Sequence, residues 1–348
     1  MPAIRKGPDI AIWEITLECN LKCIHCGSLA GKPRVGELSL RECLSLCKDL
    51  YDIGCRGVTL FGGEPLLRKD WYIIAKEIKD YGMKLSIVTN GFINHDAIVP
   101  KLHRLEIDSI QVSLDASTAK IHDMIRGVKG SFRKAIEFID ASKRLDLPIG
   151  IITTVTKLNF KELPTMIDLV REKKVNWQIQ EGMQIGGLSK DKILSKKEYL
   201  ALILFIKSTQ RRLSTEGIEV VVPHNTIPFS RFISNLNPYW DGCWAGRRTI
   251  GIQSDGSIKG CLTLPDNFIE GNIRKKRLID IWNDHDSFAY NRGFTEEDLG
   301  ELCKDCKYSR KCGGGCLARS LVLAGKLHSD PYCLYRIEEE FIKNKYRE

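Results

Sequence analysis

Three cysteines stand close together near the start of the chain, in the stretch LECNLKCIHCGS at residues 17–28. Cys19, Cys23 and Cys26 are separated by three and by two residues. Zinc sites normally take four ligands, often as two pairs of the CxxC kind. Three thiolates suit a four-iron cluster in which one iron stays open for a substrate or cofactor. The spacing therefore predicts a reactive iron–sulfur site, with a structural zinc site or unrelated thiols as the alternative.

Seven more cysteines at short spacings follow in the last third of a chain that has 13 in all. Disulfides are improbable in a reducing compartment, so clustered cysteines indicate metal. Three remaining cysteines lack such spacing, and two of them lie one helical turn apart, which favours core packing. The seven are Cys243, Cys261, Cys303, Cys306, Cys312, Cys316 and Cys333; the three are Cys43, Cys47 and Cys55.

Alternating strands and helices must position these residues. Six short β-rich runs are separated by longer amphipathic segments, and near-continuous apolar strands of this kind are typical of a parallel sheet covered by helices. Six strand–helix units fit a partial barrel better than a closed eight-stranded one. The predicted strands are 10–17, 57–61, 84–89, 109–114, 149–155 and 175–180, and the clearest helices are 39–53, 70–81, 131–145 and 160–173.

The character of the sequence changes near residue 230. A helix at 195–213 and a strand at 218–222 complete the first part. Gly, Cys and short hairpins then dominate, and IQSDGSIKGC predicts two short strands around an Asp-Gly turn. Metal rather than a large apolar core is expected to organise this second part. We therefore predict two domains, 1–230 and 231–348.

Composition narrows the class of protein. The 348 residues carry a formal charge of +9, but basic and acidic residues are interleaved and no nucleic-acid module is present, so we expect no nucleic-acid partner. The charge fits a solvated surface, a face for an acidic peptide, or compensation for anionic clusters. No apolar run is long enough for a membrane span and no signal peptide is apparent, so we expect a cytoplasmic protein.

Polar residues and glycines end the next strands. FGGEP (61–65) follows the second strand; its glycines let main chain approach a ligand, and Glu64 offers a carboxylate to an ammonium group. VTNG (88–91) and VSLDAS (112–117) end the third and fourth strands. Active sites of such folds are built at the carboxyl ends of the strands. A plain turn is the alternative for the glycine motif.

CxxxCxxC after the first strand, together with GGEP, resembles the signature of the radical S-adenosylmethionine (SAM) superfamily, over residues 10–222. The resemblance implies an α/β fold with a partial (β/α)6 barrel. It also implies that SAM chelates the open iron of a 4Fe-4S cluster held by Cys19, Cys23 and Cys26. Reductive cleavage of SAM would give a 5′-deoxyadenosyl radical that abstracts hydrogen from substrate.

The same resemblance implies roles for individual residues. Glu64 would contact the SAM amino group, and Arg126 of MIRG (124–127) its carboxylate; a surface salt bridge is the alternative for Arg126. His25 stands at a position that is usually aromatic and would lie beside adenine. No catalytic acid or base is identifiable. The implied SAM site comprises His25, Gly62, Gly63, Glu64, Thr89, Asn90, Ser113, Asp115 and Arg126.

The seven later cysteines match the spacing of the SPASM extension of radical SAM enzymes, which holds two auxiliary 4Fe-4S clusters. A zinc ribbon is the alternative. Such a ribbon, however, needs neither two further cysteines at spacings of five and three residues, as at Cys312 and Cys316, nor a distant last cysteine such as Cys333. The inner cluster lacks the eighth cysteine of some relatives and keeps an open iron or takes Asp241 or His224. The resemblance assigns Cys303, Cys306, Cys312 and Cys333 to the outer cluster and Cys243, Cys261 and Cys316 to the inner one.

Enzymes of this kind mostly modify peptides, so we expect a maturase that abstracts hydrogen from a residue of a ribosomally synthesised precursor peptide, for crosslinking, oxidation, excision or epimerisation. Because the first cysteine comes so early, we expect a separate leader-binding protein, as in pyrroloquinoline quinone and mycofactocin formation, and a flavodoxin- or ferredoxin-type electron donor. Alternatives are a radical enzyme acting on a tetrapyrrole or other small molecule, a sulfatase-maturing enzyme, or an electron-transfer scaffold without radical chemistry.

Overall fold

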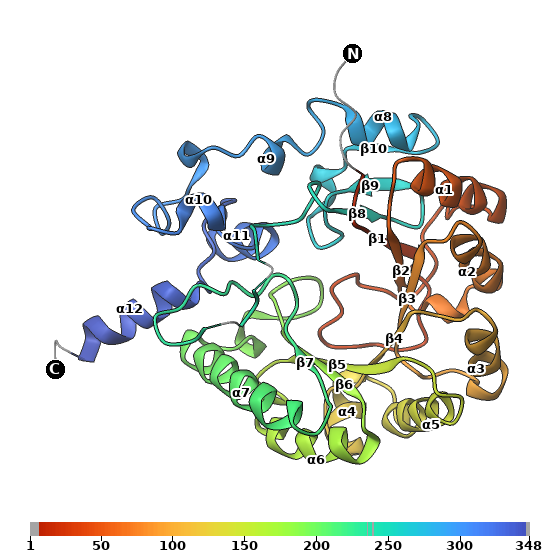
Figure 1. Ribbon diagram of the computed structural model, residues 1–348, viewed down its shortest axis with the longest axis horizontal. Helices are drawn as coiled ribbons and strands as arrows, with labels where there is room; N and C mark the ends of the chain where they lie inside the picture. Colours follow the sequence, from red (N-terminus) through yellow and green to blue (C-terminus); the bar gives the residue numbers. More distant parts are fainter. Residues whose placement is uncertain (1–6, 235, 239, 346–348) are drawn as a thin grey trace. The chain divides into compact units, whose positions relative to one another are not determined.

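The computed structural model describes residues 7–345 apart from 235 and 239, and these residues form two compact units (Figure 1). The first unit contains the described residues up to 114, together with 118–150 and 244–293. The second contains 115–117, 151–243 and 294 onward. The two predicted domains, 1–230 and 231–348, were defined by the cysteine groups they contain, not by packing. This division stays a prediction.

Strands and helices alternate in the first unit, which confirms an α/β fold with a parallel sheet. Strands β1 to β4 pair in parallel in chain order, and Figure 1 shows α1, α2 and α3 in a row along them. The elements are β1 (Ile10–Thr16), α1 (Leu40–Asp52), β2 (Gly57–Gly62), α2 (Trp71–Asp80), β3 (Lys84–Thr89), α3 (His95–Arg104), β4 (Ser109–Ser113), α4 (Ala119–Arg126) and α5 (Ser131–Lys143). Strand β5 (Ile149–Val155) begins here and runs into the second unit.

Helix α1 illustrates how sequence determines these elements. Ser39 caps its first turn, because the Ser39 hydroxyl accepts the Glu42 N–H while the Glu42 carboxylate accepts the Ser39 N–H. One face of the helix then buries Cys43, Leu46, Cys47 and Leu50. Burial raises the pKa of Cys43 to about 12. Core packing of Cys43 and Cys47 is thus confirmed.

The Asp-Gly hairpin forms as predicted, and it extends the sheet of the first unit. β8 (Thr249–Ile252) and β9 (Ser257–Lys259) are antiparallel, and Gly256 in the turn has a φ of +86°. β8 also pairs in parallel with β1, a contact between distant segments that the sequence did not predict. The remaining elements of this unit are β10 (Gly271–Asn272), α8 (Leu278–Asn283) and α9 (Ala289–Arg292).

The second unit pairs β6 and β7 in parallel. Its carboxyl-terminal part contains three helices that the sequence did not predict, since short hairpins were expected there. The elements are α6 (Leu163–Lys173), β6 (Asn176–Glu181), α7 (Lys196–Ser214), β7 (Val220–Val221), α10 (Ser309–Cys312), α11 (Leu317–Ala324) and α12 (Leu334–Lys345).

Short 3-10 helices lie at Pro65–Leu67, Phe160–Glu162, Lys190–Lys192, Asp266–Phe268 and Glu296–Asp298. Within the described part of the chain, no helix has both the length and the apolar character that crossing a membrane demands.

Candidate functional site

The first three cysteines lie on a loop that leaves the end of β1, and main-chain hydrogen bonds hold this loop to the end of α4. The Lys22 N–H donates to Arg126 O at 3.0 Å, and the Ile24 N–H donates to Ile125 O at 2.9 Å. The loop also closes on itself, because the Cys19 N–H donates to Gly31 O at 3.0 Å. The three cysteines therefore lie on a loop whose backbone is held in place by hydrogen bonds.

The two glycines of GGEP allow a second backbone to approach this loop. The Gly63 N–H donates to Thr16 O at 2.8 Å, and the Glu64 N–H donates to Glu18 O at 2.7 Å. A Cβ atom on Gly63 would lie 2.0 Å from Glu18 O, and one on Gly62, whose φ is +147°, would lie 2.1 Å from Thr16 O. Any side chain at either position would push the GGEP turn away from the cysteine loop.

Glu64 is fully buried and joins three segments. Its carboxylate accepts the Thr89 hydroxyl at 2.9 Å, the Asn90 N–H at 2.7 Å and the Leu66 N–H at 3.2 Å. Burial raises the pKa of Glu64 to about 7, against the hydrogen bonds and the Arg126 charge, which favour the ionised form. Glu64, Thr89 and Asn90 are thus brought together.

The three thiols are close enough to influence one another. Burial raises the pKa of Cys19 to about 11, and the nearby charges of Glu64, Cys23 and Cys26 act in the same direction. Each sulfur also has an N–H group in reach, from Asn90, Arg126 or the Ala30 main chain. Nitrogen donors around thiolate ligands are typical of iron–sulfur sites, so this donor set fits a cluster.

Three further residues of the implied SAM site lie at different places. Ser113 is half-buried at the end of β4, and His25 is half-buried within the cysteine loop. Asp115 is buried in the second unit, where its carboxylate accepts the Thr154 N–H at 3.0 Å. Contact of these residues with SAM stays a prediction.

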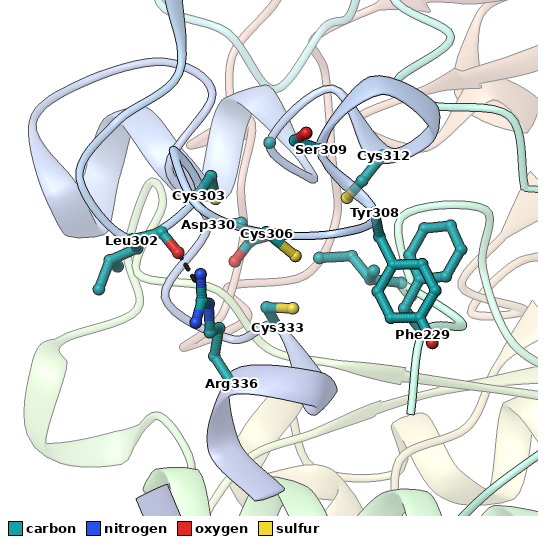
Figure 2. Close-up of a pocket in the computed structure, with 12 residues that line it drawn as sticks. Phe229, Leu302, Cys303, Cys306, Tyr308, Ser309, Cys312, Asp330, Cys333 and Arg336 are labelled. Atoms are coloured by element: carbon teal, nitrogen blue, oxygen red, sulfur yellow. Dashed lines mark hydrogen bonds between the residues drawn. The ribbon is translucent and has the colours of Figure 1, made fainter. Parts of the chain in front are cut away.

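Four of the later cysteines surround one cavity in the second unit (Figure 2). Cys303, Cys306, Cys312 and Cys333 line a narrow space that is partly open to solvent. The sulfur atoms of Cys306 and Cys312 and the Cys333 side chain lie on its inner side in this view. These are the four residues that the resemblance to the SPASM extension assigns to the outer cluster.

The wall of this four-cysteine cavity is mainly apolar and aromatic. Phe229 stacks on Tyr308 with ring centroids 4.5 Å apart, and Tyr308 meets Tyr335 edge-on at 5.2 Å. Burial raises the pKa of Cys303 to about 11 and that of Cys333 to about 12. Buried thiols of this kind ionise when they bind a metal, so four of them around one mainly apolar pocket fit a cluster.

Comparisons with known proteins agree with both sites. Residues 13–170 match the model of the radical SAM superfamily, and residues 243–307 match the model of the SPASM iron–sulfur cluster-binding domain. The chain is a radical SAM enzyme with a SPASM domain. The radical SAM domain binds a 4Fe-4S cluster and SAM, and the SPASM domain binds iron–sulfur.

Relatives match along nearly the whole chain. The AdoMet-dependent heme synthase of Methanosarcina barkeri is 29% identical, covering 97% of this chain and 99% of that protein. Mycofactocin maturase MftC of Mycobacterium ulcerans is 27% identical, covering 94% and 88%. The structure of Streptococcus suis SuiB bound to precursor peptide SuiA has a TM-score of 0.78 at 20% identity, covering 94% and 76%, and shows the same fold.

The cysteines predicted for the inner cluster of the SPASM domain lie in both units. Cys243 and Cys316 belong to the second unit, where the Cys243 charge helps burial raise the pKa of Cys316. Cys261 follows β9 in the first unit. His224 stacks near Trp240, with ring centroids 6.4 Å apart, and the identity of a fourth ligand stays open.

A buried ion group that sequence analysis missed supports the cysteines of the second unit. Arg319 lies between Asp330 and Glu181, and its guanidinium makes hydrogen bonds of 2.8 to 3.0 Å to both oxygens of the Asp330 carboxylate. Asp330 also accepts the Cys316 N–H at 3.0 Å. Glu181, which ends β6, is bound to Arg319. The sequence around Arg319, CLARS at residues 316–320, gives no sign that this arginine is buried.

When bound, the cluster supplies the electron for reductive cleavage of SAM. The residues of this chain would hold the cluster and orient the segments around it. Cys19, Cys23 and Cys26 would hold the cluster of the radical SAM domain, the GGEP turn fixes the neighbouring backbone, and Glu64 fixes the ends of β2 and β3.

Proposed function

We propose that this enzyme abstracts hydrogen from a residue of a ribosomally synthesised precursor peptide. The observation that carries the proposal is the chemistry of the half-buried faces of β2 to β6. Alternate residues of a strand share one face, and most residues on the other face of these strands are buried. Half-buried positions in these strands are occupied by hydroxyl, carboxamide and apolar side chains.

In the first unit, the polar members of this set are Thr59, Ser86, Ser109, Gln111 and Ser113. In the second unit they are Thr154, Gln178 and Gln180, and they are joined to one another. The Gln178 amide donates to the Gln180 side-chain oxygen at 3.3 Å, and the Gln180 amide donates to the Thr154 hydroxyl at 3.0 Å. Among the half-buried residues of β2 to β6, all of which the structure describes, none is charged.

This polarity suits an amide substrate. A carboxamide offers both donors and an acceptor, which matches the N–H and C=O groups of a peptide. A tetrapyrrole with ionised carboxylates is better matched by arginine or lysine, because charge-assisted hydrogen bonds are the stronger ones. The uncharged strand faces therefore favour a peptide.

Relatives support the same class. Mycofactocin maturase MftC and the PqqA peptide cyclase of Xanthomonas euvesicatoria each match at 27% identity over 94% and 95% of this chain. A separate leader-binding protein, a flavodoxin- or ferredoxin-type electron donor and a cytoplasmic location complete the proposal.

A tetrapyrrole is the second candidate substrate. One specific observation favours it, because the heme synthase of Methanosarcina barkeri matches almost its full length. Action on another small molecule or on a sulfatase remains a further alternative.

A pair of binding measurements on the reconstituted enzyme with SAM separates the two candidates. One is selection from a peptide display library, and the other is a Soret titration with iron coproporphyrin III. We expect an enriched peptide motif, lost in a Gln178→Leu/Gln180→Leu variant but kept in the control Gln210→Leu, whose amide contacts Val220 O. A saturable micromolar Soret shift without peptide enrichment would overturn the peptide proposal.

A further inference from the structure

Each sulfur of the first cysteine group receives a different nitrogen donor. The Ala30 main-chain N–H lies 3.3 Å from Cys26 Sγ. The Asn90 side-chain nitrogen Nδ2 lies 3.8 Å from Cys19 Sγ, and the Arg126 nitrogen Nη1 lies 3.7 Å from Cys23 Sγ. Two of the three donors are therefore side chains, which substitution can remove without altering the main chain.

The Asn90 carboxamide is held in one orientation. Its oxygen accepts the Phe92 N–H at 2.7 Å, so its nitrogen must face the other way, toward Cys19. That nitrogen also donates to Asn20 Oδ1 at 2.9 Å. The Asn90 main-chain N–H meanwhile donates to Glu64. Asn90 thus connects the buried carboxylate of GGEP with a ligand sulfur.

Arg126 brings a full positive charge to the second sulfur. It ends α4 and is 7% exposed. Its carbonyl accepts the Lys22 N–H, one residue before Cys23, which fixes the distance between the helix end and the loop. A buried guanidinium stays protonated, so its charge is constant across the working pH range.

We propose that Asn90 and Arg126 are positioning residues that set the reduction potential of the SAM-binding cluster. Reduction adds negative charge to a cluster and its thiolates, so N–H donors and a nearby cation stabilise the reduced form more than the oxidised form. Both residues therefore raise the potential and make the cluster easier to reduce. This inference goes beyond the proposed function and holds for a peptide or a tetrapyrrole substrate.

The experiment is a potentiometric titration of the reconstituted full chain in the absence of SAM. Electron paramagnetic resonance monitors the reduced clusters at each potential. The signal that changes on later addition of SAM identifies the relevant cluster. The variants are Asn90→Ala, Asn90→Asp, Arg126→Met and Arg126→Lys. Asn20→Ala is the matched control, because Asn20 contacts Asn90 and Phe92 O.

We expect iron content equal to wild type in every variant. The potential becomes more negative in Asn90→Ala and Arg126→Met, and more negative still in Asn90→Asp, which adds a charge. Arg126→Lys stays near wild type, and Asn20→Ala shifts least of the asparagine variants. An unchanged potential in both Asn90→Ala and Arg126→Met would overturn the proposal. Loss of iron from Asn90→Ala would also overturn it, by assigning Asn90 to holding the loop.

Discussion

The two cysteine sites of this enzyme differ in almost every physical respect. Cys19, Cys23 and Cys26 are half-buried on a loop that is held by main-chain hydrogen bonds and surrounded by polar donors. The four-cysteine cavity is lined by aromatic and apolar side chains, and three of its four cysteines are buried. Both sites carry thiols, but the first has three cysteines and the second has four. We therefore expect only the first to leave a ligand position for another molecule.

This difference follows from what each site must do. A cluster that binds SAM needs an open iron on a cysteine loop that is held in place, and the glycines of GGEP let the neighbouring turn pack directly against the backbone of that loop. A cluster that stores or passes an electron works with a complete set of ligands and a dry surrounding. The predictions below test this contrast, from the largest expected effect to the smallest.

The largest effect is expected from Cys23→Ala. Losing one of only three protein ligands leaves the SAM-binding cluster without a stable attachment, so 5′-deoxyadenosine formation with dithionite should fall below detection. Chromatography of the quenched reaction measures it. Substantial 5′-deoxyadenosine from this variant would refute the assignment of the first site.

Cys306→Ala should have a different effect. It removes one wall of the four-cysteine cavity, so about four irons per chain should be lost while uncoupled SAM cleavage continues. Iron analysis and 5′-deoxyadenosine yield, measured on the same sample, distinguish the two sites. If the SAM-binding cluster disappeared instead, the division of the ligands between the sites would be wrong.

Gly63→Ala tests the close approach of the GGEP turn. The added methyl group would lie 2.0 Å from Glu18 O, so the turn must shift, and we expect about a 10- to 100-fold loss of SAM cleavage. Gly31→Ala is the control on the same loop, because nothing lies within 4 Å of its added methyl group. Equal activity of the two variants would show that close approach is unimportant.

Arg319→Met tests the buried ion group of the second unit. It leaves Glu181 and Asp330 buried without their cation, which should lower the free energy of unfolding by about 3–5 kcal/mol. Arg310→Met removes an exposed pair with Glu296, which solvent screens, and should change the free energy of unfolding far less. Chemical denaturation measures both, and similar values would argue against a special role for Arg319.

The smallest effect is expected from Cys43→Ala. Its thiol packs in the core beneath α1, so the substitution should lower the free energy of unfolding by about 1 kcal/mol and leave the iron content unchanged. A lower iron content would make Cys43 a ligand and would extend the first site.

Local pattern was sufficient for much of the fold. The first strand is predicted at 10–17 and lies at Ile10–Thr16, and the helix predicted at 39–53 lies at Leu40–Asp52 with its Ser39 cap. Alternating apolar residues and capping residues are local signals. Pairing of β8 with β1 joins segments more than 230 residues apart, and nothing in either segment specifies that partner.

The same limit of sequence-based prediction applies to the candidate site: contacts between distant segments could not be predicted. The resemblance to the SPASM extension implied the four residues that line one cavity, because that resemblance depends on cysteine order and separation, which are visible in the chain. The donors to sulfur and the burial of Arg319 depend on which side chains the fold brings together. Asn90 was expected near SAM, but its hydrogen bond to Cys19 depends on the three-dimensional position of β3.

The most direct test of the contrast between the two sites is iron, sulfide and zinc content after anaerobic reconstitution. Wild type is compared with a variant in which Cys19, Cys23 and Cys26 are all changed to Ala. We predict about twelve irons per chain falling to about eight, without zinc, for one reactive and two auxiliary clusters. About four irons falling to none, with one or two zinc ions retained, would contradict it and make the second site a structural zinc domain.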